Sequence, residues 1–573
     1  MNDNATAEKS ASKKNEAGEE TAKLAPRVFY PAAAIILGVV ILALVSPEAT
    51  ASLVSTAGSS VIDTLGWYYV LITFGFIVFC AWLAISRFGE IKLGKDDEKP
   101  EFSTVSWFAM LFSAGMGIGL MFWGVAEPLN HYASPPPGVE GSNAEVASAA
   151  MGRTFLHWGV HAWAIYVVVG LAVAYAVHRR GLPVSIRWAL EPVLGDRVKG
   201  WLGDVIDVVA IVGTLFGVAT SLGFGVSQVG AGVTFLGITD ENTAGLQVGL
   251  IIGITLIATA SVVSGLGAGM KWLSNINLGL AGIMLISVLI LGPTLFLFRD
   301  FVEATGYYIQ NFISMSFDTL PYQGEPGESW LGGWTTYYWG WWMSWSPFVG
   351  IFIARISRGR TVREFIVGVL LVPTLLTMAW FVALGGTALY REVQGDGGLI
   401  VDGAVTTDTA LFQMLEALPG GPVLSGMAVL MIIVFFVTSS DSGSFVVDMI
   451  AHGGSANPPT WSRVFWAVLE GSIAAALIWS GAQTGATGGL AAMQTLAILA
   501  AAPFSIVMIL AAISTVKALR AEHKEKLRLE HAVLLRELAN ETAETLTTGE
   551  SGEEFAAAVS GYGDANSESN DSK

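Results

Sequence analysis

One segment of this chain gathers large aromatic rings at helical spacing. The run WTTYYWGWWMSW, from Trp334 to Trp345, holds five tryptophans and two tyrosines. Within it Trp341 and Trp345 share a helix face, and Trp342 lies beside them. Tryptophan in membrane proteins usually marks the two headgroup belts, so a dense belt anchor is one interpretation of this run. A pocket built for something that aromatic faces attract is the other.

A second aromatic group favours the pocket. The run FLHWGVHAWAIY carries Trp158, Trp163 and Tyr166, of which the last two share a helix face. Ring faces attract organic cations by about 0.5 to 2 kcal/mol per contact, and cages of rings bind quaternary ammonium groups. A belt or core role explains any single tryptophan equally well, but the two groups together predict an aromatic box for an organic cation.

The run SAGMGIGLMFWG places Gly115, Gly117 and Gly119 at alternate positions of an apolar stretch. Glycine costs about 1 kcal/mol relative to alanine inside a helix, so three close together need a reason. Either the helix is unwound here or another helix crosses closely, and the residues alone do not choose between them. A dinucleotide site is excluded, because no strand–helix–strand unit surrounds the motif.

Another apolar stretch is interrupted by the polar run FFVTSSDSGS. It brings Thr438, Ser439 and Asp441 to a depth that is expected to be apolar. A carboxyl group inside a membrane is costly enough to be a functional candidate. Hydroxyl and carbonyl oxygens are hard ligands, so this run suits a small hard cation.

Enzyme chemistry finds little support in the residues. His157 and His161 have the i, i+4 spacing of a metal site, but no Glu lies near them in the expected pattern, so we expect no metalloenzyme. No nucleophile–base pair emerges, and no GxxxxGK[ST] loop that would drive a pump with ATP occurs. Cys80 is the single cysteine, which excludes an internal disulfide and disfavours a thiol metal site.

The composition indicates which secondary-structure elements hold these residues in place. The chain of 573 residues is 53% hydrophobic and 13% charged, where about 25% charged is usual for soluble domains. We therefore predict a polytopic, all-α membrane protein. Apolar stretches long enough to span the bilayer as helices lie near 28–46, 66–86, 105–131, 153–178, 203–236, 245–265, 275–298, 333–355, 364–390, 422–451, 462–481 and 490–515.

Charge predicts the orientation of these twelve stretches. With a cytoplasmic N-terminus, only Arg153, Arg299 and Arg391 of the 30 Lys and Arg residues fall outside. Both termini are therefore expected in the cytoplasm of a cell-membrane protein. The net charge of −17 comes mostly from tails and outer loops, so it predicts no acidic or basic partner and no nucleic acid.

Both ends of the chain are rich in polar and charged residues. Residues 1–27 are polar and lack the apolar core of a signal peptide. After the last stretch, a predicted exposed helix carries basic residues from Lys517 to Arg528, which either contact anionic lipid or simply follow the last span as a basic stop. The sequence from about residue 541 is acidic and is expected to be disordered. Before the aromatic run, residues 300–332 include an amphipathic helix expected on the outer surface.

Four motifs together closely resemble the betaine–choline–carnitine transporters: GMGIGLMFWGVAEP, HWGVHAWAIY, YYWGWWMSWSPFVGIFIARISRGRT and FFVTSSDSGS. The resemblance runs from about residue 28 to 515. It implies twelve helices with two inverted five-helix repeats, the sodium-symporter (LeuT-like) fold, and a homotrimer joined partly by the outer-surface helix. The implied parts are a tail (1–27), two peripheral helices with a loop (28–104), the first repeat (105–299), the surface segment (300–332), the second repeat (333–515) and the C-terminal helix with its tail (516–573).

The resemblance also implies a residue-by-residue site. Six rings would surround a quaternary ammonium group: Trp158, Trp163, Tyr166, Trp341, Trp342 and Trp345. The substrate carboxylate would meet free backbone N–H groups from Met116 through Gly117 to Gly119. Sodium, the coupling ion in place of any cofactor, would be held by the carbonyls of Ser113, Met116 and Phe435 and the hydroxyls of Thr438 and Ser439.

Three features of the sequence refine substrate and coupling within the resemblance. Gly119 leaves the glycine motif without an acid, which favours a zwitterion such as glycine betaine over choline. The sodium-independent exchangers hold a fixed positive or bulky group at the sodium site, whereas TLFGVATSLGFG contains no Arg or Lys and favours sodium coupling. Thr214 matches one of two threonines expected at a second sodium site, but the other position is Val218, so the stoichiometry stays open.

Several alternatives also stay open. A sodium-independent betaine or carnitine exchanger shares the implied fold and box, and sodium-coupled choline uptake differs only in substrate. Ectoine, proline betaine and dimethylsulfoniopropionate are compact enough to compete with glycine betaine. Regulation by osmolality through the C-terminal helix is compatible with any of these activities.

Overall fold

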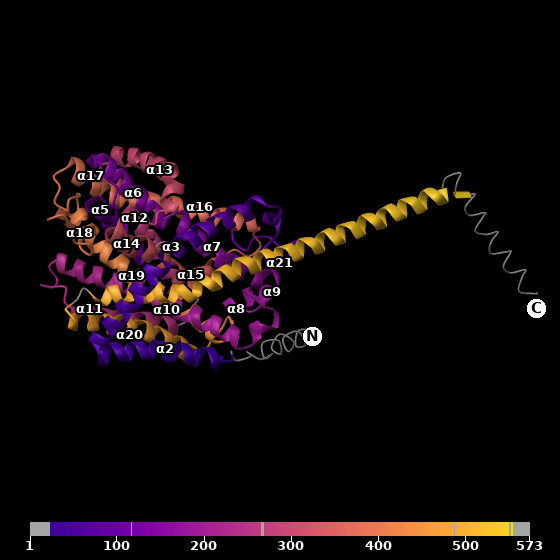
Figure 1. Ribbon diagram of the computed structural model, residues 1–573, viewed down its shortest axis with the longest axis horizontal. Coiled ribbons are helices and arrows are strands. Elements are labelled where there is room, and N and C mark those ends of the chain that lie inside the picture. The colour runs from indigo at the N-terminus through magenta and orange to yellow at the C-terminus, as the bar shows by residue number, and fades with distance from the viewer. Residues whose placement is uncertain (1–22, 116, 265–268, 486–487, 549–551, 554–573) are drawn as a thin grey trace, which may run out of the picture. The chain divides into compact units, whose positions relative to one another are not determined.

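The computed structural model describes residues 23–115, 117–264, 269–485, 488–548 and 552–553 (Figure 1). Side-chain surroundings are described for all of these except 112–115, 264, 269–272 and 544–548. The chain divides into two compact units, Met1–Thr515 and Val516–Lys573. The first unit contains every residue predicted to bind substrate or sodium.

The described chain is almost entirely helical. The first half comprises α2 (Pro26–Val45), α3 (Pro47–Ile85), α4 (Thr104–Gly115), α5 (Ile118–Ala133), α6 (Asn143–Trp158), α7 (Val160–Ala174), α8 (Ile186–Ala189), α9 (Glu191–Leu194), α10 (Trp201–Phe235), α11 (Ala244–Ser264) and α12 (Gly269–Leu291). The second half comprises α13 (Thr294–Ser316), α14 (Gly324–Leu331), α15 (Tyr337–Ile356), α16 (Val362–Phe381), α17 (Thr387–Gln394), α18 (Ala410–Glu416), α19 (Gly421–Ala451), α20 (Thr460–Gln483) and α21 (Gly488–Thr548).

Short turns of other helix types and one hairpin connect these helices. They are η1 (Arg87–Glu90), η2 (Tyr175–Arg179), η3 (Gly195–Lys199), η4 (Gly332–Thr336), η5 (Val382–Gly386), β1 (Ile400–Val401) and β2 (Ala404–Val405). The hairpin pairs Ile400 with Val405 across an Asp402–Gly403 turn, both of whose residues have positive φ. Asp-Gly is a preferred pair for this kind of two-residue turn.

Ten helices of the described chain are long and apolar enough to cross a membrane. They correspond to ten of the twelve predicted stretches, and α10 (Trp201–Phe235) reproduces the predicted 203–236 within two residues. The stretches 105–131 and 333–355 are not among the ten. The first is split into two short helices, α4 and α5, and the second is rich in tryptophan and tyrosine, which score low on hydropathy scales.

Backbone breaks interrupt two predicted stretches near the aromatic rings. Gly117 is extended, with φ −158° and ψ −175°, between α4 and α5. This favours the unwound interpretation of the glycine motif. Gly159 separates α6 from α7, and a Cβ there would lie 2.4 Å from the carbonyl oxygen of Phe155, so a side chain does not fit. By contrast, α19 runs unbroken through Thr438, and the polar run is accommodated within a regular helix.

Burial separates inner from outer helices. In the apolar part of each span, 89% of the residues are buried in α6–α7 and 78% in α10, against 28% in α11 and 22% in α12. Exposed apolar side chains such as Ile257 and Ile286 on the outer helices suit contact with lipid rather than water. The most buried of these spans, α6–α7, carries Trp158, Trp163 and Tyr166.

Helix α15, which bears the aromatic run, packs closely against α7 and α10. A Cβ at Gly350 would lie 2.7 Å from Val169, and a Cβ at Gly217 would lie 3.2 Å from Trp345. Small residues at such crossings let two helix backbones approach, which is the usual mode of packing inside membranes. The rings of α15 are thereby set into the middle of the first unit.

The predicted surface helix corresponds to α13, which is followed by α14. Its exposed apolar residues, such as Ile309 and Ile313, lie on the side opposite the buried Tyr308. Arg153 of α6 pairs with Asp318, just beyond α13, at 2.8 Å. In the second unit, α21 extends to Thr548, past residue 541 where the tail is expected to become disordered.

Candidate functional site

The six predicted rings line one pocket in the middle of the first unit. The residues around it are Gly117, Gly119, Leu120, Trp158, Ala162, Trp163, Tyr166, Trp341, Trp342, Trp345 and Thr377. They come from α5, α6, α7, α15 and α16. Leu120, Ala162 and Thr377 were not predicted, and their residue types carry no signal that would single them out.

The rings form two walls. On α15, Trp341 and Trp342 stack with centroids 4.4 Å apart, and Trp345 stacks on Trp341 at 6.2 Å. Opposite them, Trp158 meets Trp342 edge-on at 4.9 Å, and Tyr166 meets it edge-on at 6.2 Å. Edge-to-face and offset contacts of this kind are the preferred arrangements of aromatic pairs. Faces and edges from both walls thus surround the pocket.

Hydrogen bonds to backbone fix the rings of α15. The indole Nε1 of Trp342 donates to the carbonyl of His157 at 2.9 Å, and that of Trp341 donates to Gly217 at 3.3 Å. Two other polar atoms, the Tyr166 hydroxyl and Trp345 Nε1, have no partner in the described part of the chain. A buried donor without a partner is costly, so these two are available to a polar ligand.

Gly119 forms the floor between the two walls. A Cβ at this position would lie 2.7 Å from the Trp341 ring and 2.9 Å from the Trp158 ring. The extended Gly117 immediately precedes α5, and the first N–H groups of a helix lack intrahelical partners. Such a helix start favours an anionic group.

The pocket itself is nearly closed, with a cavity volume of about 20 Å³. That is room for about one water molecule. A larger cavity of about 510 Å³ adjoins it, because Gly117 and Trp345 line both. A further cavity of about 510 Å³, lined by residues such as Phe122 and Gln494, shares no lining residue with the box. A ligand would therefore reach the box more directly through the first large cavity.

The predicted sodium ligands are brought together only in part. Phe435, Thr438 and Ser439 line the large cavity beside Gly117, and Thr438 Oγ1 donates to the Phe435 carbonyl at 3.2 Å. Ser113 falls near the end of α4, but its surroundings and all of Met116 lie outside the described residues. The α19 half of the predicted set therefore faces the break between α4 and α5.

Of the two positions expected at a second sodium site, one carries a hydroxyl and the other does not. Thr214 on α10 is fully buried, and its Oγ1 has no partner among the described residues. Val218, one turn later, lies against α19, where a Cβ on Gly443 would be 3.1 Å from its methyl group. The position expected to supply a second hydroxyl thus supplies an apolar contact.

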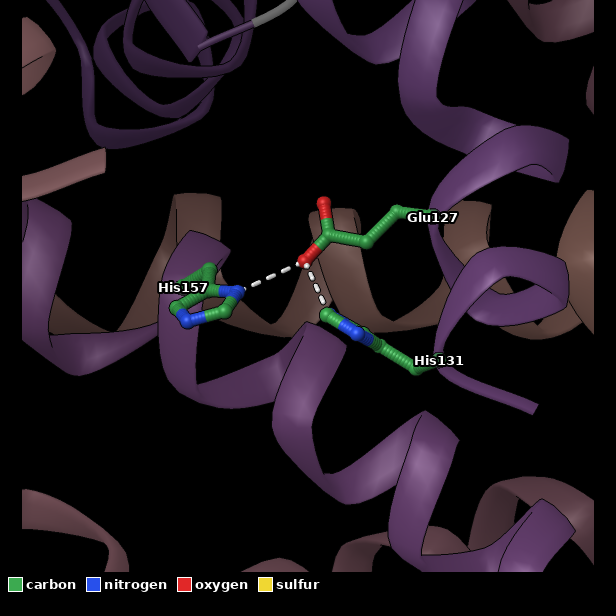
Figure 2. Close-up of side chains that lie close together, drawn as sticks. All are labelled: Glu127, His131 and His157. Atoms are coloured by element: carbon green, nitrogen blue, oxygen red, sulfur yellow. Dashed lines mark hydrogen bonds and ion pairs between the residues drawn. The ribbon is translucent and has the colours of Figure 1, made fainter. Parts of the chain in front are cut away.

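An acid that the sequence spacing did not indicate lies beside His157. Glu127 of α5 accepts from His157 Nδ1 at 2.7 Å and from His131 Nε2 at 3.3 Å, and all three are fully buried (Figure 2). The sequence pattern of a metal-binding helix considers only neighbours along one helix, so it did not point to Glu127, which lies on a different helix from His157. His161 instead bonds Ser316 at 2.8 Å.

These three residues also have the composition of a metal site, since their donor atoms all lie within 4.8 Å of one another. Two ligands of a tetrahedral zinc ion, with bonds of about 2.1 Å, would be about 3.4 Å apart. The 2.7 Å between His157 Nδ1 and Glu127 is instead a hydrogen-bond distance. We therefore interpret the cluster as hydrogen-bonded.

Comparison with known proteins places the chain among transporters. A model of the betaine/carnitine/choline transporter family matches residues 27–524. The glycine betaine transporter OpuD of Bacillus subtilis is 45% identical over 499 residues, which cover 87% of this chain and 95% of that protein. An uncharacterized transporter of Mycobacterium tuberculosis is 51% identical over 513 residues, covering 89% and 85%. A glycine betaine/proline/choline/ectoine transporter of Vibrio parahaemolyticus is 42% identical over 491 residues, covering 85% and 86%.

Proposed function

The chain belongs to the betaine/carnitine/choline transporter family, and on that premise we propose that it imports a zwitterionic quaternary ammonium solute, foremost glycine betaine, by sodium symport. The observation that carries the proposal is the pocket lined by six aromatic rings from two walls. No charged side chain occurs among the described residues that line it. A box of this kind suits a ligand whose positive charge is spread over methyl groups and whose net charge is zero.

Binding follows from the geometry of the two walls and the floor. The trimethylammonium group would lie among the ring faces, each contributing about 0.5 to 2 kcal/mol in a desolvated site. The carboxylate would point toward the helix start at Gly117 and Gly119, where free N–H groups replace a basic side chain. Because the cavity holds about 20 Å³, the two walls must separate for the solute to enter.

Sodium coupling rests on the neighbouring oxygen atoms. Phe435, Thr438 and Ser439 line the cavity beside the helix break, and the Phe435 carbonyl and the two hydroxyls would supply hard oxygen ligands of the kind that suits a small hard cation. An ion that joins α19 to the α4–α5 break would favour the arrangement in which the break offers its N–H groups to the carboxylate. Sodium and solute would then favour the same conformation of the protein, so each would raise the affinity for the other. This coupling is the thermodynamic basis of symport.

The remaining proposals concern the surroundings. We propose that both termini lie in the cytoplasm and that three copies associate partly through α13. We also propose that the basic residues from Lys517 to Arg528 contact anionic lipid. Ectoine and choline are the alternative substrates. A sodium-independent exchanger is the alternative mechanism.

Uptake of labelled glycine betaine into proteoliposomes tests the proposal. With sodium outside we expect accumulation that disappears when potassium replaces sodium. Equal uptake in potassium, accelerated by unlabelled solute inside, would identify an exchanger and contradict the sodium assignment. Competition by unlabelled ectoine, choline and proline betaine would rank the substrates.

A matched pair of tryptophan substitutions controls this experiment. Trp342→Leu removes a ring that lines the box, whereas Trp67→Leu removes a ring that is 57% exposed on α3. We expect the first to raise the KM for glycine betaine at least tenfold and the second to leave it unchanged. Equal effects of the two substitutions on the KM would contradict a role of the aromatic box in binding the solute.

A further inference from the structure

We propose that Glu127 is a positioning residue that sets the orientation of Trp158 in the aromatic box. The inference rests on the proposed function, since it concerns the affinity of that box. Glu127 does not line the pocket, whereas Trp158 does. The contact between them is direct, because Trp158 Nε1 donates to Glu127 Oε2 at 2.6 Å.

The carboxylate of Glu127 is saturated with donors. Oε2 accepts from Trp158 and from the Tyr338 hydroxyl. Oε1 accepts from His157 and His131, the two contacts drawn in Figure 2. An ionised carboxylate offers about four acceptor positions, so these four partners fill it. Hydrogen bonds to a charged acceptor are about twice as strong as neutral ones, and the group holds its partners in one geometry.

The surroundings of His157 favour the orientation that donates to Glu127. His157 Nε2 lies 3.0 Å from the Thr335 hydroxyl, and the His157 ring stacks on Tyr338 at 4.6 Å. With Thr335 as donor to Nε2, the proton of a neutral His157 sits on Nδ1, where it meets Glu127. The cluster therefore joins α5, α6 and α15 through a single carboxylate.

Trp158 is fixed at both of its ends by this arrangement. Its pyrrole N–H is bound by Glu127, and its six-membered ring lies over Gly119, where a Cβ would approach to 2.9 Å. The rest of the ring contacts Trp342 and Phe381, with centroids 4.9 and 5.3 Å away, and lines the pocket. Without the hydrogen bond at Nε1 the indole would lose one of its anchors and gain rotational freedom, and a solute would have to order it on binding.

The first test replaces Glu127 by Gln, which keeps the size of the side chain but turns one acceptor oxygen into a donor. We expect the KM for glycine betaine to rise at least tenfold, while the maximal rate changes less than threefold. Glu470→Gln is the matched control, because Glu470 is also fully buried but accepts from Ser440 of α19 at 3.0 Å and lies outside the box. An unchanged KM in Glu127→Gln, or an equal rise in Glu470→Gln, would overturn the proposal.

A second variant distinguishes position from charge. Glu127→Asp keeps the negative charge but withdraws it by one methylene group, so it cannot reach Trp158 Nε1 in the same geometry. We expect a KM closer to that of Glu127→Gln than to that of the unchanged protein. Recovery of KM to within twofold of the unchanged protein would mean that charge alone acts, and would contradict a positioning role.

A third measurement does not depend on the identity of the solute. In protein labelled with 5-fluorotryptophan, the fluorine resonance of Trp158 is assigned by its disappearance in Trp158→Phe. We expect Glu127→Gln to shift and broaden this resonance and Glu470→Gln to leave it in place. An unmoved resonance would refute the positioning role, and a moved resonance without glycine betaine uptake would refute only the proposed substrate.

Discussion

Gly119 shows how a single residue sets the width of the box. The space where its Cβ would lie is already occupied by the edges of Trp341 and Trp158, at 2.7 and 2.9 Å. Approaches below about 3 Å force something to move, and neither indole is free to do so because each Nε1 is hydrogen-bonded. The glycine is required at this position for close approach and not for an unusual backbone angle.

The variant Gly119→Ala tests this requirement. An added methyl group would push the two rings apart, so we expect the KM for glycine betaine to rise at least tenfold. Gly249→Ala is the control, since no atom lies within 4 Å of a Cβ there on α11. Equal transport by the two variants, measured in proteoliposomes, would show that the floor of the box tolerates a side chain.

Asp300 on α13 predicts a pH dependence of stability. Burial, together with the nearby Glu303 carboxylate, raises the pKa of Asp300 to about 7. An unfolded aspartate ionises near pH 3.9, so the folded form retains a proton that the unfolded form loses. The contribution of this retained proton to the free energy of unfolding is complete below about pH 4. It falls as the pH rises toward 7 and is lost above pH 7.

Asp300→Asn removes this titration. We expect the Tm of the variant, relative to the unchanged protein, to increase progressively from pH 5 to pH 7.5. The measurement is thermal unfolding in detergent at several pH values. A Tm difference that stays constant over this range would contradict the assignment.

Among the helices, the site depends on how closely α15 approaches α7. Gly350 allows the approach, since a Cβ there would lie 2.7 Å from Val169 and 3.1 Å from the backbone nitrogen of Gly170. Gly170 of α7 is restricted in the same way, since a Cβ there would lie 2.6 Å from the side chain of Ile353 on α15. Backbone atoms cannot yield as a flexible side chain can, so the crossing admits little change.

Gly350→Ala should therefore destabilise the protein by about 1–3 kcal/mol, the usual cost of overpacking. Gly306→Ala on α13 meets no atom within 4 Å and should instead be neutral or stabilise by up to about 1 kcal/mol, because alanine favours the helix. Thermal unfolding of both variants provides the comparison. A stability gain in Gly350→Ala would show that the two helices are not in tight contact.

Features that depend on a single helix could be predicted from the sequence, whereas contacts between helices could not. Apolar length located spans such as α10 and α20 closely, and spacing along one helix placed Trp163 beside Tyr166. The break at Gly159 was not foreseen, because a single glycine in an apolar stretch usually continues the helix. Glu127 was not foreseen either, because its partner His157 lies on a neighbouring helix, and periodicity does not say which helix faces meet.

In the molecule as a whole, the second unit begins just after the last predicted span. Residues from Val516 onward form a unit of their own, and the basic residues Lys517 to Arg528 occur at its start. Each basic residue near an anionic membrane surface contributes about 1 kcal/mol of attraction. The unit contains none of the residues assigned to the box.

Deletion of residues 517–573 should therefore leave glycine betaine uptake at low osmolality intact and remove its activation at high osmolality. The measurement is the uptake rate in proteoliposomes containing anionic lipid, over a series of external osmolalities. Activation that persists unchanged in the truncated protein would exclude the second unit as the regulatory element.

Recognition of a positive charge through ring faces distinguishes the proposed box from an ordinary apolar pocket. Calorimetry separates the two by comparing the binding of glycine betaine with that of 3,3-dimethylbutanoate, in which carbon replaces the quaternary nitrogen at nearly the same size. Cation–π contacts with several desolvated rings predict that, with sodium present, glycine betaine binds at least tenfold more tightly. Equal affinity for the two compounds would mean that the pocket selects shape and apolar surface alone, and would contradict recognition of the charge.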